Sequence, residues 1–482
     1  MAKFDETPIV KDPAVNGLLR APDLRENASA NVKCWPSKPK DTAQINLPTE
    51  RVPDWQARGV ARLGELLEKN KALRVFMDIC VRCGACADKC QFYLGTGDPH
   101  NMPVARAELL RAVYRRYYTP AGRWFPQANN AADFDEEMLA LWYTYFYQCS
   151  ECRRCSVFCP YGIDTAEITM AAREIMASIG VSTKYVTEVV AKVYEHGNNL
   201  GIPPAAWKDN CEFLEEDLQE QTGVPIRFPV DDYGAEVLLV APSADNFANT
   251  ETMIGYAKIF HVLGVRWTTS TYCNEGGNFG LFLNFANLKK INKRIVDAAR
   301  MLGVKRIIWG ECGHAWRAGI LTPTLNGPMD MFDPPYPYHI CQYVAEMLRK
   351  GAFEGKIDKS ANDQYIVTYH DPCNPARAGQ LLEEPREIVR AACNHFIEMP
   401  ADTIREKTFC CGAGGGLLTD EVMPIRMAGG KPRAMAVKHV GANFVATPCA
   451  ICKAQLPEVM KYWEVPAEVG GVVQLLGNAL KL

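Results

Sequence analysis

Five cysteines in the last quarter of the chain form a pattern that side-chain packing does not explain. They are Cys373, the neighbours Cys410 and Cys411, and the pair Cys449 and Cys452. A disulfide between sequence neighbours is strained. The glycine-rich run after Cys411 lets backbone amides approach a bulky group closely. We therefore interpret these thiolates as a sign of an anionic metal–sulfur cofactor; the alternative is core packing beside a turn.

Two further cysteine runs have the spacing of bacterial ferredoxins. The pattern Cys-x2-Cys-x2-Cys-x3-Cys occurs at residues 80–90 and again at 149–159, where Pro160 follows. In ferredoxins with two clusters, the fourth cysteine of each run binds the other cluster. The spacing therefore predicts two cubane [4Fe-4S] clusters. The first has the ligands Cys80, Cys83, Cys86 and Cys159, and the second has the ligands Cys149, Cys152, Cys155 and Cys90.

Four cations lie inside these runs: Arg82, Lys89, Arg153 and Arg154. Positive charge beside an iron–sulfur cluster raises its reduction potential. The other interpretation is a solvated charged face. The first run also departs from the ferredoxin pattern, because Gln91 rather than proline follows Cys90.

Composition narrows the classes of protein to consider. The chain has 482 residues, a formal net charge of −3 and 19 cysteines, most of which stand in short clusters. Clustered cysteines indicate metal sites in a reducing compartment. No basic run suggests a nucleic-acid partner. With neither a signal pattern nor an apolar run of about 18 residues, we expect a cytoplasmic protein that reaches the membrane's inner face through partner subunits.

Periodicity places these motifs on two kinds of framework. Helical spacing dominates from about residue 57 to residue 225. Short β-branched runs alternate with helical stretches after about residue 235, which favours α/β units. The predicted helices include Ala57–Leu67, Val104–Tyr118, Phe134–Tyr147, Ile168–Ile179 and Lys184–His196. The predicted strands are Val237–Val240, Arg306–Trp309, Tyr365–Tyr369 and Asn443–Thr447.

The α/β region repeats itself. The segment 271–277 parallels 409–415, so that Cys273 matches Cys411 at an offset of 138. Cys312 matches Cys449 at an offset of 137. We infer two related halves with cysteines at the carboxyl ends of strands, where open α/β sheets bind ligands.

The first half has lost most of the thiols. Ser243, Tyr272 and Ala315 stand where the second half has Cys373, Cys410 and Cys452. Two thiols are too few for a four-iron cluster, so we expect one cluster in this domain and not two. Cys273 and Cys312 either face the same cavity or are buried like ordinary core cysteines.

These observations predict an α+β multidomain protein, with a helical two-cluster ferredoxin-like domain followed by a duplicated α/β cysteine-rich domain. An extended Pro-rich arm precedes both; it either wraps a partner or forms a disordered tail. The predicted ranges are 1–60 for the arm, 61–225 for the ferredoxin-like domain, and 226–482 for the duplicated domain, with a degenerate half at 226–355 and a ligand-bearing half at 356–482.

The order of motifs resembles the catalytic-subunit family of heterodisulfide reductases, over roughly residues 75–480. Its signature is a Cys, then Cys-Cys-Gly, then Cys-x-x-Cys. Cys373, Cys410-Cys411-Gly412 and Cys449-Ala450-Ile451-Cys452 match it. Asn374 departs from the family pattern, in which histidine often follows the first cysteine. The degenerate first half and the long arm are similar to the DsrK branch of this family.

The resemblance implies a so-called CCG domain whose five cysteines, Cys373, Cys410, Cys411, Cys449 and Cys452, hold a noncubane [4Fe-4S] cluster. It implies an oxidoreductase that acts on sulfur groups and splits S–S bonds in one-electron steps. The partners implied are an integral-membrane quinone or haem b subunit (DsrM-like), other subunits of the complex, and a small DsrC-like sulfur carrier of dissimilatory sulfur metabolism.

Cleavage of an S–S bond also requires protons. His314 and His370 stand near the expected cluster loops, and each is either a general acid near neutral pH or a structural histidine. One rival function is an iron–sulfur electron-transfer subunit of a glycolate, lactate or glycerol-3-phosphate dehydrogenase system. Another rival, a redox sensor or scaffold, is disfavoured because the sequence has no DNA-binding element.

Overall fold

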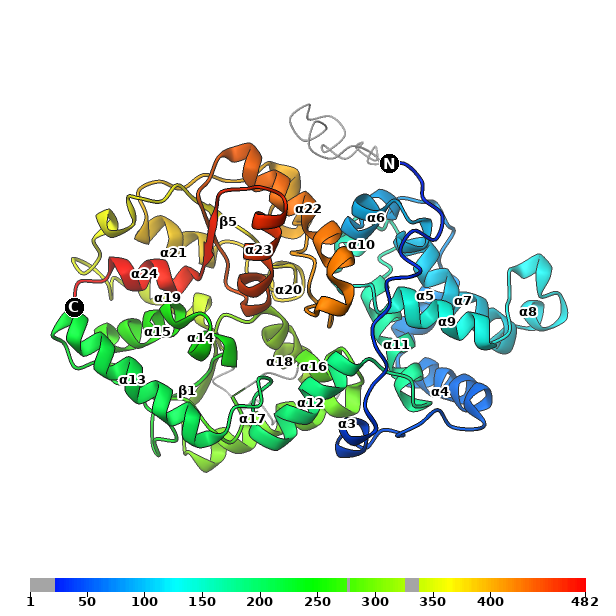
Figure 1. Cartoon of the computed structure of the whole chain (residues 1–482), viewed down its shortest axis with the longest axis horizontal. Helices are drawn as coiled ribbons and strands as arrows, with labels where there is room; N and C mark the ends of the chain where they lie inside the picture. The colour runs from blue at the N-terminus through cyan, green and yellow to red at the C-terminus, as the bar shows by residue number, and fades with distance from the viewer. Residues whose placement is uncertain (1–21, 275–277, 326–337) are drawn as a thin grey trace. The chain divides into compact units, whose positions relative to one another are not determined.

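The computed structural model describes residues 22–274, 278–325 and 338–482, and these residues form two compact units (Figure 1). Unit 1 contains the described residues up to Ala191, together with Leu281–Phe285 and Phe409–Arg433. Unit 2 contains the other described residues, from Lys192 to Leu482. The units are defined by packing, and the predicted domain boundaries stay a prediction.

Unit 1 is helical, and each helix predicted from periodicity is present. The apolar stripe Leu63, Leu66 and Leu67 of α4 is buried. The side chain of Asp135 caps the start of α9, and that of Asp164 caps α11. The helices of this region are α3 (Pro39–Gln44), α4 (Trp55–Lys69), α5 (Lys71–Asp78), α6 (Gln91–Thr96), α7 (Pro103–Tyr118), α8 (Pro120–Trp124), α9 (Glu136–Phe146), α10 (Arg154–Val157), α11 (Thr165–Ser178) and α12 (Lys184–His196).

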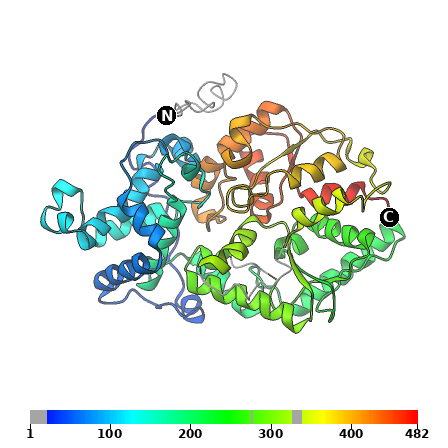
Figure 2. The same cartoon turned by 180° about the vertical axis from the view of Figure 1, so that it is seen from behind.

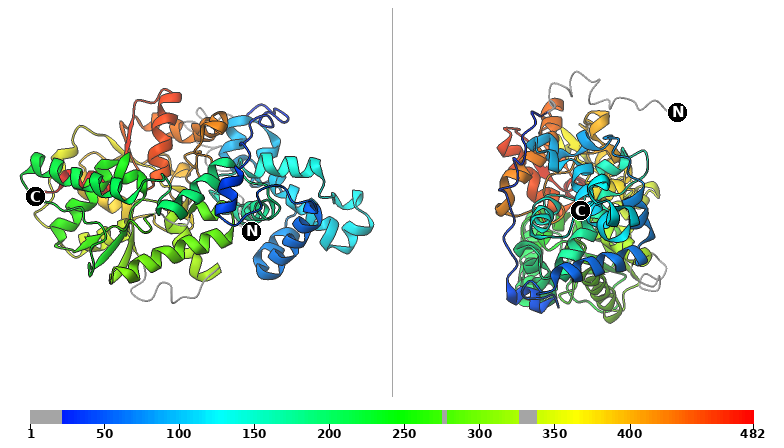
Figure 3. Two further views of the ribbon diagram at one scale, coloured as in Figure 1. Left: turned by 60° about the horizontal axis from the view of Figure 1, so that its bottom comes forward. Right: turned by 90° about the vertical axis from the view of Figure 1, so that its right-hand side faces the viewer.

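Helices α7, α9 and α11 pack against one another and form the centre of unit 1, which Figure 3 shows from two further directions. The aromatic side chains of α9 belong to this core, since Trp142, Tyr145 and Phe146 are all fully buried. Burial on this scale supplies much of the hydrophobic stabilisation of a helical unit. The core fixes α7 and α11 beside the two ferredoxin-type runs.

The described part of the predicted arm lies against unit 1. The backbone N–H of Ser29 donates to Asp98 over 3.0 Å, and Gln148 donates to the carbonyl of Ser29 over 3.0 Å. The hydroxyl of Tyr143 donates to the carbonyl of Cys34 over 2.9 Å. Helix α4 begins at Trp55, before the predicted end of the arm. This arm segment therefore packs on the chain's own helices.

Unit 2 contains two parallel sheets. The first has the strand order β2-β1-β3-β4, with β1 (Val237–Val240), β2 (Trp267–Thr268), β3 (Arg306–Trp309) and β4 (Tyr338–His339). The second has the order β5-β6-β7, with β5 (Val367–Tyr369), β6 (Phe444–Ala446) and β7 (Glu468–Gly470). All four predicted strands are present, and β5 and β6 are shorter than predicted.

The two sheets share a strand order. An isolated parallel bridge joins Val367 to Phe396, on the side of β5 that corresponds to the β2 side of β1. If the segment at Phe396 is counted as the second strand segment of the later half, both halves have their second segment beside the first, followed by the third and the fourth. This common order agrees with the predicted duplication, which itself remains a prediction.

Helices from each half of unit 2 pack on helices of the other half. Helix α15 (Thr250–Leu263) packs on α24 (Val472–Ala479), and α19 (Ile340–Arg349) packs on α21 (Glu384–Ala392) (Figures 1 and 2). A side chain on Gly477 would lie 2.8 Å from the Cα of Gly255, so glycine allows the close approach of α15 and α24. The remaining α-helices in the described residues are α13 (Pro204–Thr222), α14 (Ser243–Phe247), α16 (Asn278–Leu281), α17 (Phe285–Met301), α18 (Gly313–Leu325), α20 (Cys373–Arg377), α22 (Met423–Val440) and α23 (Ala450–Tyr462).

Some predicted features lie outside the described residues. These are residues 1–21 of the arm and Glu275, Gly276 and Gly277 of the repeat. Within the described ranges, no helix combines the length and the apolar character needed to cross a bilayer.

Candidate metal centres

The first ferredoxin-type run lines a cavity with about 420 Å³ of atom-free space. Cys80, Cys83, Cys86 and Cys159 all lie on its wall, so the structure brings together the four predicted ligands of the first cubane. Cys83 is exposed. Two apolar side chains of the wall, Val81 and Tyr161, are exposed by 60% and 44%. This first cavity therefore opens to solvent.

The second run lines a neighbouring cavity with about 340 Å³ of atom-free space. Its wall holds Cys90, Cys149, Cys152 and Cys155, the predicted ligands of the second cubane. Cys155 also borders the first cavity, together with Pro103 and Thr165, so these residues form the partition between the two.

The pKa of the shared Cys155 is affected by cysteines of the second predicted set. Burial raises the pKa of Cys155 well above its usual value, and the nearby charges of Cys152, Cys149 and Cys90 add to the rise. Burial also raises the pKa of Cys86 to about 11, and the charges of Cys159 and Cys80 contribute. The pKa of each of these two thiols is thus raised by cysteines of its own predicted set.

The two cysteine runs also share a backbone conformation. Arg82 and Glu151 occupy the same place in their runs and have positive φ angles of 54° each. Gly84 and Arg153 likewise correspond, with φ angles of 79° and 63°. Successive left-handed residues turn backbone N–H groups into a concave surface that suits an anion. The N–H of Glu151 lies 3.4 Å from the sulfur of Cys149.

Each cavity wall contains a buried arginine from α7. Burial opposes the charge of Arg106 in the second cavity, yet the thiolates of Cys149, Cys90 and Cys155 raise its pKa. Burial lowers the pKa of Arg111 in the first cavity, partly offset by Cys80. A [4Fe-4S] cluster with four thiolates is anionic, so both cavities fit such a group in donor type and in charge.

Sequence reasoning missed both arginines. The available signal was their position on a helix whose other inward residues, such as Leu110 and Val113, are apolar. The structure also places the four cations that lie inside the cysteine runs. Arg154 is fully buried, with its guanidinium 3.8 Å above the ring of Phe409, and Lys89 is buried beside it. Arg82 and Arg153 instead form ion pairs, with Glu108 and with Asp164 and Glu167 respectively.

The loop Phe409–Gly416, here called the Cys-Cys-Gly loop, belongs to unit 1 and carries buried Cys410 and Cys411. Gly412 has a φ of 103°, and a side chain there would lie 2.5 Å from the carbonyl oxygen of Arg426. The N–H of Gly412 lies 3.4 Å from the sulfur of Cys410. Glycine is therefore required at this turn, and its amide faces a thiol.

A buried arginine of α11 ties this loop to the second ferredoxin-type run. Arg173 donates to the carbonyl of Gly415 over 2.7 Å and to the carbonyl of Cys149 over 2.8 Å. Its charge is paired with Glu151 at 3.0 Å, where both side chains are fully buried. A side chain on Gly415 would lie 2.7 Å from the carbonyl oxygen of Cys149. The Cys-Cys-Gly loop and the second run are thus in direct contact within unit 1.

The other three cysteines of the signature belong to unit 2, at the carboxyl ends of β5 and β6. Cys373 is the first residue of α20, and Cys449 directly precedes α23, which contains Cys452. All three are buried. A hydrogen bond with Cys452, followed by contact with His314, holds the pKa of Cys449 well below its usual value. His314 therefore lies beside a predicted ligand, and its role as a proton donor stays a prediction.

The remaining candidates occupy equivalent strand ends. His370 follows β5 and is fully buried. Asn374, the departure from the family pattern, lies 3.4 Å from the sulfur of Cys373 and accepts from Arg317 over 3.1 Å. Cys312 is buried and receives the N–H of Ala315 at 3.4 Å, whereas Cys273 is buried after β2. These placements leave the roles of His370, Cys273 and Cys312 as predictions.

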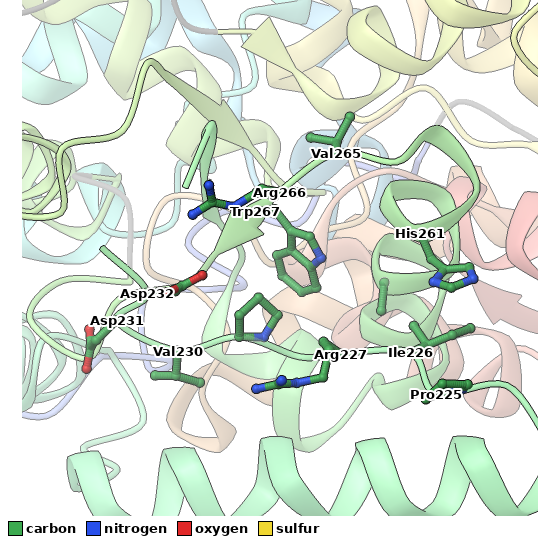
Figure 4. A pocket seen from close by; sticks show the side chains of 12 residues that line it. Pro225, Ile226, Arg227, Val230, Asp231, Asp232, His261, Val265, Arg266 and Trp267 are labelled. Atoms are coloured by element: carbon green, nitrogen blue, oxygen red, sulfur yellow. The ribbon is translucent and has the colours of Figure 1, made fainter. Parts of the chain in front are cut away.

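Unit 2 also has a larger cavity, with about 1050 Å³ of atom-free space (Figure 4). None of the residues that line it belongs to a cysteine motif. Its wall includes Trp267 and the charged residues Arg227, Asp231, Asp232 and Arg266. In the part of the chain that the structure describes, no three Cys, His, Asp or Glu side chains converge as they would around one metal ion. A four-iron cluster instead takes one thiolate per iron.

Comparison with known protein families agrees with this division of the cysteines. A profile described as a 4Fe-4S dicluster domain matches residues 76–163, and a profile described as a cysteine-rich domain matches residues 367–457. The first match contains both ferredoxin-type runs. The second contains all five cysteines of the C-terminal signature.

Several known proteins are similar over most of the chain. The Hdr-like menaquinol oxidoreductase iron-sulfur subunit 2 of Archaeoglobus fulgidus is 44% identical, over 92% of this chain and 85% of the relative. A corresponding protein of Archaeoglobus profundus is 43% identical, over 89% and 84%. The dihydromethanophenazine:CoB–CoM heterodisulfide reductase of Methanosarcina barkeri has a polypeptide that is 23% identical, over 84% and 94%.

Proposed function

The chain belongs to the family of Hdr-like menaquinol oxidoreductase iron–sulfur subunits, and from this premise we propose that it is the catalytic iron–sulfur subunit of a quinone-linked membrane complex. Its substrate would be a disulfide or trisulfide, reduced or formed at the five-cysteine centre. Reduction of a disulfide consumes two electrons and two protons and gives two thiols. When bound, the two cubanes supply single electrons, and a noncubane [4Fe-4S] cluster supplies a site for one substrate sulfur.

The observation that carries this proposal is the contact between the second ferredoxin-type run and the Cys-Cys-Gly loop. Arg173 bonds the carbonyls of both Cys149 and Gly415, and Arg154 stacks on Phe409, the residue before Cys410. This contact supports a direct electron path between the second cubane site and the thiols of the C-terminal signature.

The proposed order of the two cubane sites follows from their surroundings. The first cavity has an exposed ligand, Cys83, so a redox partner can approach it closely. The second cavity adjoins the Cys-Cys-Gly loop. We assign the first cavity to exchange with the membrane partner and the second to exchange with the five-cysteine centre.

The chain's own residues would divide the remaining work. Cys373, Cys410, Cys411, Cys449 and Cys452 would hold the noncubane cluster. His314, beside Cys449, is the better placed proton donor for a departing sulfur, with His370 as the second candidate. Cys273 and Cys312 of the first half would line the same region.

At a finer level we assign the chain to the DsrK branch. The membrane partner would be a DsrM-like quinone or haem b subunit, and the substrate would be the cysteine tail of a DsrC-like sulfur carrier. Attachment to the cytoplasmic face of the membrane would pass through partner subunits. The long arm and the degenerate first half are the features that favour this branch.

The test is anaerobic turnover by the purified complex with reduced viologen as electron donor. We expect viologen oxidation with the oxidised sulfur carrier, at least about tenfold slower in Cys449→Ser and in His314→Gln, the latter with its iron content unchanged. Activity with glycolate or lactate and none with any disulfide or trisulfide would contradict the proposal and support an electron-transfer subunit of a hydroxy-acid dehydrogenase.

A further inference from the structure

A fully buried ion cluster joins the two halves of unit 2 next to the Cys449–Cys452 turn. The ammonium of Lys453 lies 2.6 Å from Asp245 and 3.1 Å from Glu311, and it donates to Thr252 over 2.9 Å. Lys453 directly follows Cys452, whereas both carboxylates come from the first half. Side-chain exposure is 1% for Lys453 and zero for both acids.

The two carboxylates are themselves held in place. Tyr256 donates to Asp245 over 2.9 Å and accepts the backbone N–H of Glu311 over 2.6 Å. The other oxygen of Glu311 accepts the N–H of Val473 over 2.9 Å. A side chain on Gly471 would lie 2.5 Å from Glu311, so the packing leaves no room for displacement. Charged groups in such surroundings are costly to bury unless they are paired and hydrogen-bonded.

The same acid also bonds the turn through its backbone. The N–H of Ala450, the residue after Cys449, donates to the carbonyl of Glu311 over 2.7 Å. The turn is therefore bonded to the first half at two points, one at Ala450 and one at Lys453. The sequence offset of 137 places Pro448 opposite Glu311 and Trp316 opposite Lys453 in the repeat, so this ion cluster has no counterpart with the halves exchanged.

We propose that Lys453 is a positioning residue and that the first half, which has lost most of its own thiols, serves as a carboxylate clamp (Asp245 and Glu311) that fixes the Cys449–Cys452 turn at the sulfur-binding centre. The inference rests on the proposed function, because it takes Cys449 and Cys452 as cluster ligands. It gives the first half a role that does not require a second cluster. Residues behind metal ligands typically change metal affinity or activity by about 10–100-fold when replaced.

The test uses the purified complex and three variants. Lys453→Met removes the clamped charge, and Lys453→Met with Asp245→Asn removes one charge of each sign, so that the net charge of the cluster is unchanged and Glu311 keeps the N–H of Val473 as its partner. Lys461→Met is the matched control, since it makes the same change on an exposed residue of the same helix, α23. Each variant is measured for iron content, for melting temperature and by EPR of the oxidised protein with 2-mercaptoethanol.

We expect the control to match the wild type. The double variant should keep its fold and the iron of both cubanes, while the oxidation-dependent signal of the five-cysteine centre falls by about tenfold or changes shape. A double variant with the melting temperature of the wild type and an unchanged EPR signal of the five-cysteine centre would overturn the clamp. Unfolding of the double variant would also overturn it, because the ion cluster would then support the fold as a whole rather than one turn.

The same experiment separates the clamp from the proposed function. A wild-type complex with no oxidation-dependent signal would overturn the proposed function itself, and the clamp with it. A wild-type signal that is unaffected in the double variant would overturn the clamp alone.

Discussion

The two cysteine-lined cavities of unit 1 have the same ligand spacing and the same loop conformation, yet they differ in what surrounds the sulfurs. The first has an exposed cysteine and an exposed apolar rim. The wall of the second contains fully buried polar residues, among them Gln91, Arg106 and Arg154, and no exposed cysteine. The cysteine spacing thus places the predicted ligands, whereas the surrounding helices and loops determine which of them is exposed and which charged side chains lie beside them.

A chain of hydrogen bonds links a wall residue of the second cavity to the arm. Arg106 donates to Asn101 over 2.6 Å, and Asn101 donates to Ser29 over 3.0 Å. Ser29 in turn bonds Asp98. These hydrogen bonds connect Arg106, on the wall of the second cavity, to the arm, whereas Cys83 on the wall of the first cavity is exposed.

The largest predicted effect tests whether the fourth cysteine of each run binds the cluster of the other run. Cys80→Ser with Cys159→Ser should remove one cluster and leave the other, because both residues belong to the first cavity. Cys80→Ser with Cys90→Ser should remove both. Iron and sulfide analysis and EPR of the reduced protein give the count. The reverse result, with both clusters lost in the first pair and one in the second, would show that each run binds its own cluster.

The next effect concerns the charge beside the second cavity. Arg106→Met should lower the reduction potential of the second cubane by about 60 mV or more, the one-electron equivalent of a tenfold change in equilibrium constant. The potential of the first cubane should stay the same. In Arg106→Lys, the potential of the second cubane should lie between its values in the wild type and in Arg106→Met. Redox titration followed by EPR measures this. Equal shifts of both cubanes would contradict the separate environments.

Exposure should also govern loss of the clusters. During timed exposure to ferricyanide or air, we expect the first cubane to disappear several-fold faster than the second, because its cavity has an exposed ligand. EPR of samples reduced after each interval follows both signals. Simultaneous loss, or earlier loss of the second cubane, would show that the exposure of Cys83 does not make the first cluster easier to lose.

The smallest effect concerns the arm. Burial favours the neutral form of Asp98, but hydrogen bonds from His100 and Ser29 outweigh it and hold the pKa of Asp98 well below its usual 3.8. A lowered carboxyl pKa stabilises the fold above the unfolded-state pKa, and this contribution is lost only as the pH falls through the folded-state value. It is fully present at pH 7.

Asp98→Asn should therefore lower the free energy of unfolding by about 1–3 kcal/mol at pH 7. Thermal unfolding measures the change, with Asp88→Asn, at an exposed acid of the first cysteine run, as the control. An unchanged melting temperature in Asp98→Asn would mean that the arm adds no stability to the second cavity.

Sequence reasoning succeeded where spacing is local. Cysteines three or four residues apart dictate cluster loops, and five helices and four strands followed from hydrophobic periodicity. It failed where function depends on contacts between distant segments. The buried guanidinium of Arg106 lies 39 residues from the Tyr145 carbonyl that it bonds, and Arg173 lies 242 residues from Gly415. Periodicity carries no information about such pairs, so neither the arginines nor the packing of the Cys-Cys-Gly loop in unit 1 was predicted.

The clamp on Lys453 illustrates the same limit. Its partners come from 208 and 142 residues away, and each looks like an ordinary helix-terminal or loop residue in the sequence. The loss of most thiols in the first half was visible from the repeat, but the ion cluster of Asp245, Glu311 and Lys453 became visible only when the fold placed these residues together.

The central claim is that the five cysteines of the C-terminal signature hold a cluster that binds a substrate sulfur. EPR of the anaerobically purified, oxidised complex, with and without a DsrC-like carrier, tests it most directly. We predict a paramagnetic signal that appears on oxidation, changes shape when the carrier is added, and is missing in Cys449→Ser. If only the signals of reduced cubanes appear and no thiol changes them, the five-cysteine site is not the catalytic centre.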